Sequence, residues 1–141
     1  MIRADSVQMR NGTQDEALER LIHTVIGAAI EVHRALGPGY LESVYEEALC
    51  VELEMRRIPF GRQVAVGVQY KGRAVGSGIM DILIGGGLVV ELKAVETIAP
   101  IHMAQVLSYL KATKHPAGLL INFNVVVLRE GIKRVVLSNP S

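Results

Sequence analysis

Two acidic residues and a lysine flank a run of three glycines in the middle of the chain. Asp81 precedes Gly85-Gly86-Gly87, and Glu91 and Lys93 follow it. If a three-residue loop is centred on Gly86, Asp81 and Glu91 face each other across an antiparallel pair, with Cβ atoms about 4.5–5.5 Å apart. Because side chains alternate along a strand, Lys93 lies on the same face as Glu91. The spacing therefore predicts two carboxylates and an ammonium group on one patch.

This patch has a chemical use. Two carboxylates so close together repel each other unless a positive charge lies between them. Mg²⁺ binds oxygen ligands, and a bound Mg²⁺ polarises a phosphate and lowers the pKa of an attacking water, which Lys93 would orient or activate. The residues alone leave an alternative open, in which Lys93 and Glu91 form a surface salt bridge and Asp81 is an ordinary strand-end residue.

A third acid lies on a predicted helix. Glu42 falls on the same helical stripe as Tyr45 and Leu49, which predicts that it points toward the packed side. A carboxylate there needs a cation or several hydrogen bonds. Alternatively, Glu42 interacts with the positive end of the helix dipole. The other acids of this helix are expected to face solvent: Glu46, Glu47 and Glu54.

A later helix adds polar side chains that could contact phosphate or orient the acids. Gln105 and Tyr109 are four residues apart and share a face, and His102 lies one turn before Gln105. The alternative for Gln105 and Tyr109 is an ordinary polar edge. His102 is interpreted as a capping or solvent-side residue.

The elements that must position these residues follow from hydrophobic periodicity and from the glycines and prolines between apolar runs. The patterns predict a flexible arm over 1–14 and one α+β domain with a mixed sheet over 15–141. The expected helices cover 15–36, about 41–57 and about 100–113. The expected strands cover 64–70 (half-buried), 74–84, 88–93 and 117–122, followed by a closing hairpin of 125–128 and 133–137.

Composition excludes several classes of protein. The chain has 141 residues, of which 50% are hydrophobic, with 15 Lys and Arg against 14 Asp and Glu. This balance excludes a disordered chain and a nucleic-acid binder driven by a basic tail. No apolar run is long enough to span a membrane and no secretory signal is visible, so we expect a cytoplasmic protein. The lone Cys50 excludes an internal disulfide framework and is interpreted as a buried structural thiol.

Four segments occur in the order of one known family. Residues 39–45 read GYLESVY and carry Gly-x-x-Glu-x-x-Tyr, and residues 91–96 read ELKAVE. Residues 102–113 and 118–123 follow as that family's next helix and strand. Together they resemble the GxxExxY protein family, which is grouped with the PD-(D/E)XK nuclease superfamily. The resemblance covers about 16–136, nearly the whole folded part.

The resemblance implies a restriction-endonuclease-like α-β-β-β-α-β core and a metal-dependent phosphodiesterase site. It makes Asp81 the acid of the second core strand and Glu91 with Lys93 the E-x-K of the third. Glu42 corresponds to the acid of the first core helix. Asp81, Glu91 and Glu42 would then hold Mg²⁺ or Mn²⁺, and Lys93 would position the water.

The same resemblance assigns the remaining polar residues. Gln105 and Tyr109 are similar to a Gln-x-x-x-Tyr motif of the exonuclease-like branch, and Tyr45 and His102 have supporting places. Met80 departs from the pattern, because it stands where the superfamily name has Pro.

The function expected from these observations is a metal-dependent nuclease that hydrolyses phosphodiester bonds of DNA or RNA. Two alternatives stay open. In the first, the same fold is a non-catalytic module that binds nucleic acid or a protein, which the near-neutral charge and the low aromatic content of 4% favour. In the second, the patch stabilises a homodimer whose interface is the apolar surplus of the surface.

Overall fold

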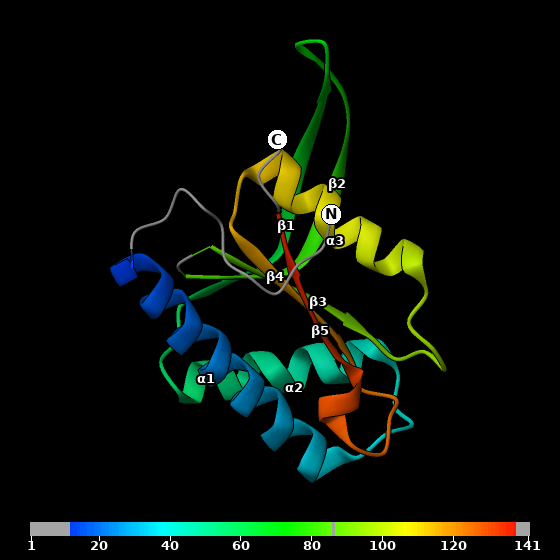
Figure 1. Cartoon of the computed structure of the whole chain (residues 1–141). Helices are drawn as coiled ribbons and strands as arrows, with labels where there is room; N and C mark the ends of the chain where they lie inside the picture. Colours follow the sequence, from blue (N-terminus) through cyan, green and yellow to red (C-terminus); the bar gives the residue numbers. More distant parts are fainter. Residues whose placement is uncertain (1–11, 86, 138–141) are drawn as a thin grey trace.

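A computed structural model describes residues 12–85 and 87–137, with side chains from Asp15 onward. The described residues form one five-stranded mixed sheet, in the order β1-β2-β3-β4-β5, and three α-helices (Figure 1). Along the chain the elements are α1 (Gly12–Leu36), α2 (Glu42–Met55), β1 (Phe60–Tyr70), β2 (Arg73–Ile84), β3 (Leu88–Lys93), α3 (Pro100–Thr113), β4 (Ala117–Asn122), the 3-10 helix η1 (Leu128–Gly131) and β5 (Ile132–Val136). None of the described helices is both long and apolar enough to cross a membrane.

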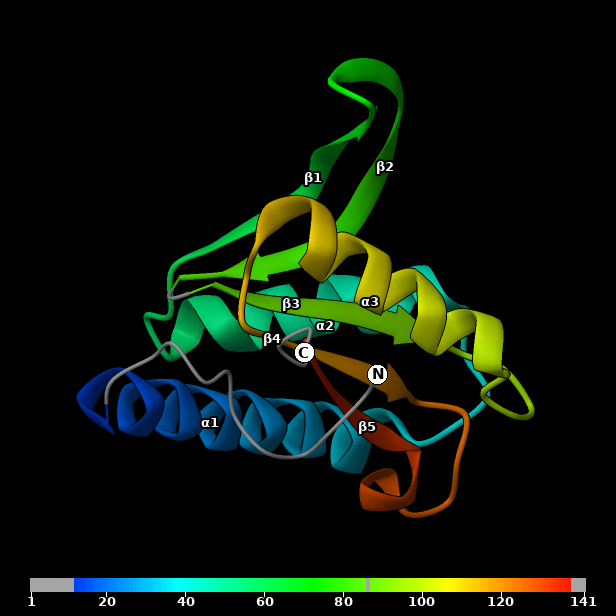
Figure 2. The ribbon, with the colours of Figure 1, turned by 45° about the horizontal axis from the view of Figure 1, so that its top comes forward.

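The sheet lies between two helical layers, with α1 and α2 on one face and α3 on the other (Figure 2). Only β3 and β4 pair in parallel, and α3 is the crossover between them, whereas the other neighbours are antiparallel. Each face of the sheet buries its own apolar cluster, which is why β3 and β4 read as nearly continuous apolar runs. The free Cys50 is buried on the α1–α2 side, as predicted.

The middle of the chain follows the sequence prediction closely. The bounds of β3, α3 and β4 agree with the predicted ranges, and Ile84 pairs with Leu88 and Leu83 with Val89, as a loop centred on Gly86 requires. Gly86 itself lies outside the described residues. The glycine run therefore sets the register of the strands that carry Asp81 and Glu91.

The predicted ends of the chain are partly wrong. Residues 12–14 belong to α1, not to an arm, and residues 1–11 of the predicted arm lie outside the described residues. The second helix ends at Met55, two residues early, because Arg57 has a φ of 59°. No strand forms over 125–128: residues 124–127 are bends that lead into η1, and β5 pairs with β4 alone. His33 Nε2 instead lies 2.7 Å from the Val125 carbonyl, holding this loop against α1.

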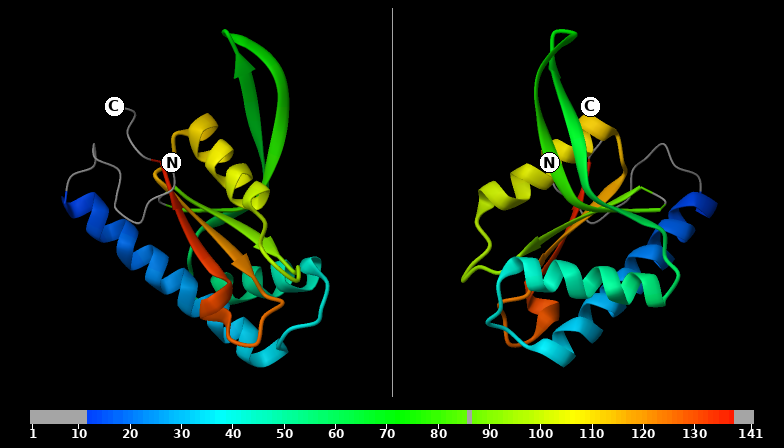
Figure 3. Two further views of the ribbon diagram at one scale, coloured as in Figure 1. Left: turned by 45° about the vertical axis from the view of Figure 1, so that its right-hand side comes forward. Right: turned by 180° about the vertical axis from the view of Figure 1, so that it is seen from behind.

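Strands β1 and β2 form a long hairpin that projects beyond the body of the molecule (Figure 3). Tyr70 pairs with Arg73, and the two-residue turn Lys71-Gly72 has φ angles of 50° and 79°, as a type I′ turn requires. The prediction of a half-buried strand over 64–70 is wrong beyond Val66, because the core does not extend under the outer part of the hairpin. β1 also begins earlier than predicted, at Phe60.

At Asp81 the side chains of β2 change the side of the sheet on which they pack. Residues two apart on a regular strand share a face, yet Met80 packs against the α3 cluster and Ile82 against the α1–α2 cluster. Across the pair, Arg62 faces Ile82 and Val64 faces Met80, while Gln63 between them has a φ of 53° and no pairing partner. The local twist at Gln63 and Asp81 therefore turns the outer hairpin away from the sheet.

A buried carboxylate on α2 fixes this twist. Glu46 is only 9% exposed, and its two oxygens accept hydrogen bonds from Arg62 Nε at 2.7 Å and Gln63 Nε2 at 2.9 Å. A left-handed φ in a residue other than glycine is uncommon and needs support from its surroundings. Glu46 supplies that support at Gln63, next to the strand position of Asp81.

Tyr45 fixes the connection between α1 and α2. Its buried hydroxyl donates to the Gly37 carbonyl at 2.6 Å and accepts from the Tyr40 amide at 3.1 Å. Its ring stacks on Phe123, with centroids 4.6 Å apart. These contacts make Tyr45 a residue that positions the start of α2, where Glu42 lies.

We expect Tyr45→Phe to lower the free energy of unfolding by about 1–2 kcal/mol, because it removes a buried hydroxyl with two backbone partners and keeps the ring stacking. Chemical denaturation measures this loss. Tyr40→Phe is the matched control, since Tyr40 is 50% exposed and only its backbone amide forms a hydrogen bond. Equal stability of the two variants would contradict this role for Tyr45.

Candidate active site

Asp81 and Glu91 meet where β2 and β3 separate. The backbone pairing of the two strands stops at Ile82 and Val90. Beyond that point, the Asp81 amide donates to Glu91 Oε1 at 2.8 Å, and the Leu92 amide donates to Asp81 Oδ2 at 2.8 Å. Each carboxylate thus accepts a hydrogen bond from the opposite strand in place of the missing ladder, and the two acids are held side by side.

Burial makes this arrangement electrostatically costly. Glu91 is only 4% exposed, and Asp81 is half-buried. Burial first, and then the charge of Asp81, raise the pKa of Glu91 to about 8. Neither carboxylate forms a salt bridge with any residue in the described part of the chain. In the absence of a cation, Glu91 therefore keeps a proton near neutral pH.

Lys93 ends β3 one step along the same face and is half-buried. Its charge lowers the pKa of both Glu91 and Glu42, against the larger effects that raise them. The ammonium group therefore lies close enough to act on both acids, without forming a salt bridge to either among the described residues. The three residues that the spacing predicted on one patch are brought together.

Asn122 is a residue that the sequence reasoning missed. It pairs with Lys93 across the parallel strands and is 2% exposed. Its side chain accepts from the Val95 amide at 3.0 Å and donates to the Val95 carbonyl at 2.8 Å. It thus clamps the chain just after Lys93 to the end of β4. The only signal in the sequence is a polar residue closing an otherwise apolar run.

Glu42 is the first residue of α2 and approaches the pair from the helix side. Its side chain is exposed, yet burial of its carboxyl and then the charge of Asp81 raise its pKa. The prediction that Glu42 faces the core and Glu46 faces solvent is wrong. Glu46 is the buried acid, because it faces the base of β1, where Arg62 and Gln63 neutralise and bind it.

Helix α3 places Tyr109 and Gln105 over the acids. Burial first, and then the charges of Glu91 and Asp81, raise the pKa of Tyr109, while hydrogen bonds with the Ile79 backbone and the Gln105 side chain lower it. Gly78 leaves room for the tyrosine, since a Cβ there would lie 2.8 Å from Tyr109 Cε1. Gln105 is exposed beside it.

His102 is not brought to the acids. Its Nδ1 accepts from the Ala99 amide at 3.0 Å and caps the start of α3. The capping interpretation of His102 is therefore confirmed.

Comparison with family models decides the affiliation of the chain. The model of the PD-(D/E)XK nuclease superfamily matches residues 19–135. The chain belongs to the PD-(D/E)XK nuclease superfamily. Its mixed sheet and three helices agree with that fold, so the predicted fold class is confirmed. No curated protein and no solved structure matches the chain.

Nucleases of the PD-(D/E)XK superfamily generally use divalent metals, and the residues present fit such an ion. Asp81 and Glu91 offer hard oxygen donors, and a cation would relieve the repulsion that raises the pKa of Glu91. Among residues 12–85 and 87–137, no group of three or more His, Cys, Asp or Glu could hold a metal. Two carboxylates are nevertheless a donor set that suits Mg²⁺, which is often held by one or two carboxylates together with water and phosphate.

The raised pKa of Glu91 predicts a pH dependence of folding in metal-free protein. Unfolded Glu91 ionises near its ordinary pKa of 4.5, whereas the folded protein keeps the proton up to about pH 8. The folded state binds more protons over this interval, so the contribution of Glu91 to stability falls as the pH rises. We expect Glu91→Gln to gain stability relative to wild type across this interval.

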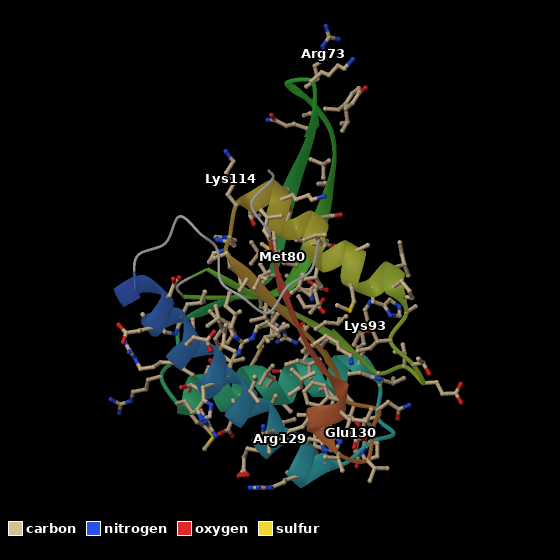
Figure 4. All side chains as sticks on the ribbon, in the orientation of Figure 1. Arg73, Met80, Lys93, Lys114, Arg129 and Glu130 are labelled. Atoms are coloured by element: carbon tan, nitrogen blue, oxygen red, sulfur yellow. The ribbon has the colours of Figure 1, made fainter. Side chains whose placement is uncertain are left out.

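Urea denaturation in EDTA at several pH values tests this expectation. The matched control is Glu130→Gln, which neutralises an exposed acid on η1 at the opposite end of the molecule from the hairpin (Figure 4). Parallel stability curves for wild type and Glu91→Gln would contradict a raised pKa at Glu91.

Proposed function

We propose that this chain is a metal-dependent nuclease that hydrolyses phosphodiester bonds of DNA or RNA. The observation that carries the proposal is the Asp81–Glu91 pair, a buried and mutually repelling pair of carboxylates on a PD-(D/E)XK nuclease fold. Such a pair lowers stability in isolation and is explained by a cation that completes it. Nucleic acid is the substrate that superfamily membership suggests.

In this proposal Asp81 and Glu91 bind Mg²⁺ or Mn²⁺, and Glu42 completes or orients the coordination shell from the start of α2. A divalent ion bound there lowers the pKa of a water and offsets charge that develops on the phosphate. Lys93 holds the attacking water or hydroxide beside the acids, because its ammonium group lies near both Glu91 and Glu42.

The α3 residues act on the substrate side of the pair. Gln105 is exposed and offers an amide that can donate to a phosphate oxygen. Tyr109 shields Glu91 from water and carries the hydroxyl that Gln105 contacts. We infer that this face of α3 holds the phosphate against the acids.

The resemblance of residues 39–45 and 91–96 supports a narrower assignment within the superfamily, to the GxxExxY family. In that assignment Glu42 and Tyr45 are the signature residues, one beside the acids and one fixing the start of α2. The cytoplasmic location and the homodimer suggested by the sequence stay predictions.

A non-catalytic module that binds nucleic acid or a protein is the second candidate. The observation in its favour is that the described residues contain no third ligand that is gathered tightly with Asp81 and Glu91. Metal binding and cleavage separate the two candidates.

The decisive assay incubates the chain with single- and double-stranded DNA and RNA, with and without Mg²⁺ or Mn²⁺. We expect cleavage that needs the metal and that falls at least about 100-fold in Asp81→Asn and in Lys93→Ala, because each removes a group that acts on the reacting atoms. Glu130→Gln and Lys133→Ala are matched controls, since both residues are exposed and lie outside the cluster. Cleavage by Asp81→Asn and by Lys93→Ala at the wild-type rate would contradict the proposal.

Titration of Mn²⁺ by calorimetry tests the metal site separately from activity. We expect about one ion per chain for wild type, with proton release near neutral pH, because Glu91 must lose its proton to bind. Asp81→Asn and Glu91→Gln should lose this binding, and Glu130→Gln should keep it. Unchanged binding in Glu91→Gln would exclude the pair as the metal site.

A further inference from the structure

The outer hairpin and the end of α3 carry positive charge with no negative charge to offset it. No Asp or Glu occurs over residues 55–80 or 97–129. The tip of the hairpin carries Lys71 and Arg73, and the last turn and cap of α3 carry Lys111 and Lys114, all four exposed. Figure 4 shows Arg73 and Lys114 pointing outward in the half of the molecule opposite Arg129. Within the part of the chain that the structure describes, a near-neutral protein therefore carries a locally basic surface here.

A shallow groove joins the two basic sites. It is lined by Gly67, Val68 and Gln69 of β1 and by Ser108, Lys111 and Ala112 of α3. β1 is the edge strand of the sheet, so its outer backbone has no neighbouring strand there. We call the groove together with Lys71, Arg73 and Lys114 the hairpin–α3 surface.

The hairpin–α3 surface is continuous with the candidate active site. Gln105, Ser108 and Ala112 recur at three- and four-residue steps, so they form one exposed stripe along α3. The stripe begins at Gln105 beside the acids and ends in the groove. On the other side, β2 runs without interruption from Arg73 at the tip to Asp81.

We propose that the hairpin–α3 surface binds the nucleic-acid strand on which Asp81 and Glu91 act. Its exposed cations match a row of phosphates, and its lack of carboxylates leaves nothing to repel a polyanion. Tyr70 is 64% exposed at the tip; Lys71 Nζ lies over one face of its ring, 5.4 Å from the centroid, and the other face can stack on a base. The inference rests on the proposed function for the identity of its partner and names the part of the chain that supplies affinity.

The hairpin–α3 surface would offset the repulsion between the acids of the candidate active site and a nucleic acid. Two carboxylates repel the phosphate backbone, and the net charge of +1 supplies no general attraction. Basic residues placed away from the acids restore attraction without neutralising them. The metal then acts on one phosphate, while the hairpin–α3 surface holds its neighbours.

A second copy of the chain fits the surface less well. Val68, Tyr70 and Val75 are exposed on the hairpin and could pack against another hairpin. That packing would bring the basic tips of two copies together, with no acid over residues 55–80 of either copy to pair with them. Self-association is therefore an outcome that the test must detect.

The length of the hairpin gives a quantitative expectation. Asp81 lies eight positions after Arg73, which corresponds to about 26 Å of strand. A nucleic-acid strand advances about 3.4 Å per nucleotide in a duplex, so about eight nucleotides reach from the acids to the tip. A duplex shorter than this should not contact the tip residues when it is bound at the acids.

The experiment measures binding of labelled oligonucleotides of about 6 and about 16 nucleotides, single- and double-stranded, by fluorescence anisotropy over a series of salt concentrations. Asp81→Asn is present throughout so that nothing is cleaved. Lys71→Ala/Arg73→Ala tests the tip and Lys111→Ala/Lys114→Ala tests the helix. Arg34→Ala/Arg129→Ala is the matched control, because it removes two exposed cations outside this surface.

For the longer oligonucleotide, each test pair should lower affinity at least about tenfold near 0.1 M salt and reduce the salt slope by about 2, since each phosphate contact contributes about 1. The control pair should change neither quantity. For the shorter oligonucleotide, the tip pair should have a smaller effect on affinity than for the longer one. Equal losses in the control pair, or no binding of either oligonucleotide, would overturn the proposal.

Two further readouts keep this inference separate from the proposed function. Size-exclusion chromatography detects a dimer and shows whether Val68→Ser/Val75→Ser dissociates it. Such a dimer, together with nucleic-acid binding that the two basic-pair variants leave unchanged, would assign the hairpin to self-association instead. Binding through the surface without cleavage by the metal-loaded wild type would overturn the nuclease and keep the surface. Metal-dependent cleavage at the wild-type rate by variants of the four basic residues would keep the nuclease proposal and overturn the role of the hairpin–α3 surface.

Discussion

The repulsion between Asp81 and Glu91 is the interaction on which the rest of the site depends. The fold brings the two carboxylates together where β2 and β3 separate, and each accepts a hydrogen bond from the backbone of the opposite strand. Burial strengthens the repulsion and raises the pKa of Glu91. A proton relieves it in metal-free protein, and a divalent cation would relieve it in the active form. The proposed metal site would explain why the fold tolerates this cost to stability.

The twist beside Asp81 connects this pair with the shape of the molecule. Glu46 binds Arg62 and Gln63, and Gln63 takes a left-handed backbone conformation opposite Asp81. The hairpin consequently leaves the sheet at this point and extends past α3 (Figure 3). This local irregularity lies beside the acids and sends basic residues outward, so the candidate active site and the proposed binding surface meet at the same point of the fold.

The sequence predicted those features of the fold and site that neighbouring residues determine, and it failed where a contact between distant elements determines the structure. The three-glycine loop set the register of Leu83 with Val89, which places Asp81 opposite Glu91, and apolar runs bounded by Pro100 and Pro116 gave correct bounds for α3 and β4. The twist at Gln63 was not predictable, because its cause is a carboxylate from another element. The same long-range contact explains why Glu46 is buried and Glu42 exposed, the opposite of what the helical pattern predicted. Residues 125–128 have a strand-like pattern but form bends that lead into η1, where the Val125 carbonyl contacts His33 of α1, a long-range contact that the local pattern does not encode.

The most direct test is an anomalous difference map from crystals of the full chain grown with Mn²⁺ near pH 8, the pKa to which burial and Asp81 raise Glu91. The account predicts a peak between the carboxylates of Asp81 and Glu91 that is lost in Glu91→Gln. A map in which Mn²⁺ binds elsewhere, with the Asp81–Glu91 pair still joined only through backbone amides and a shared proton, would contradict it.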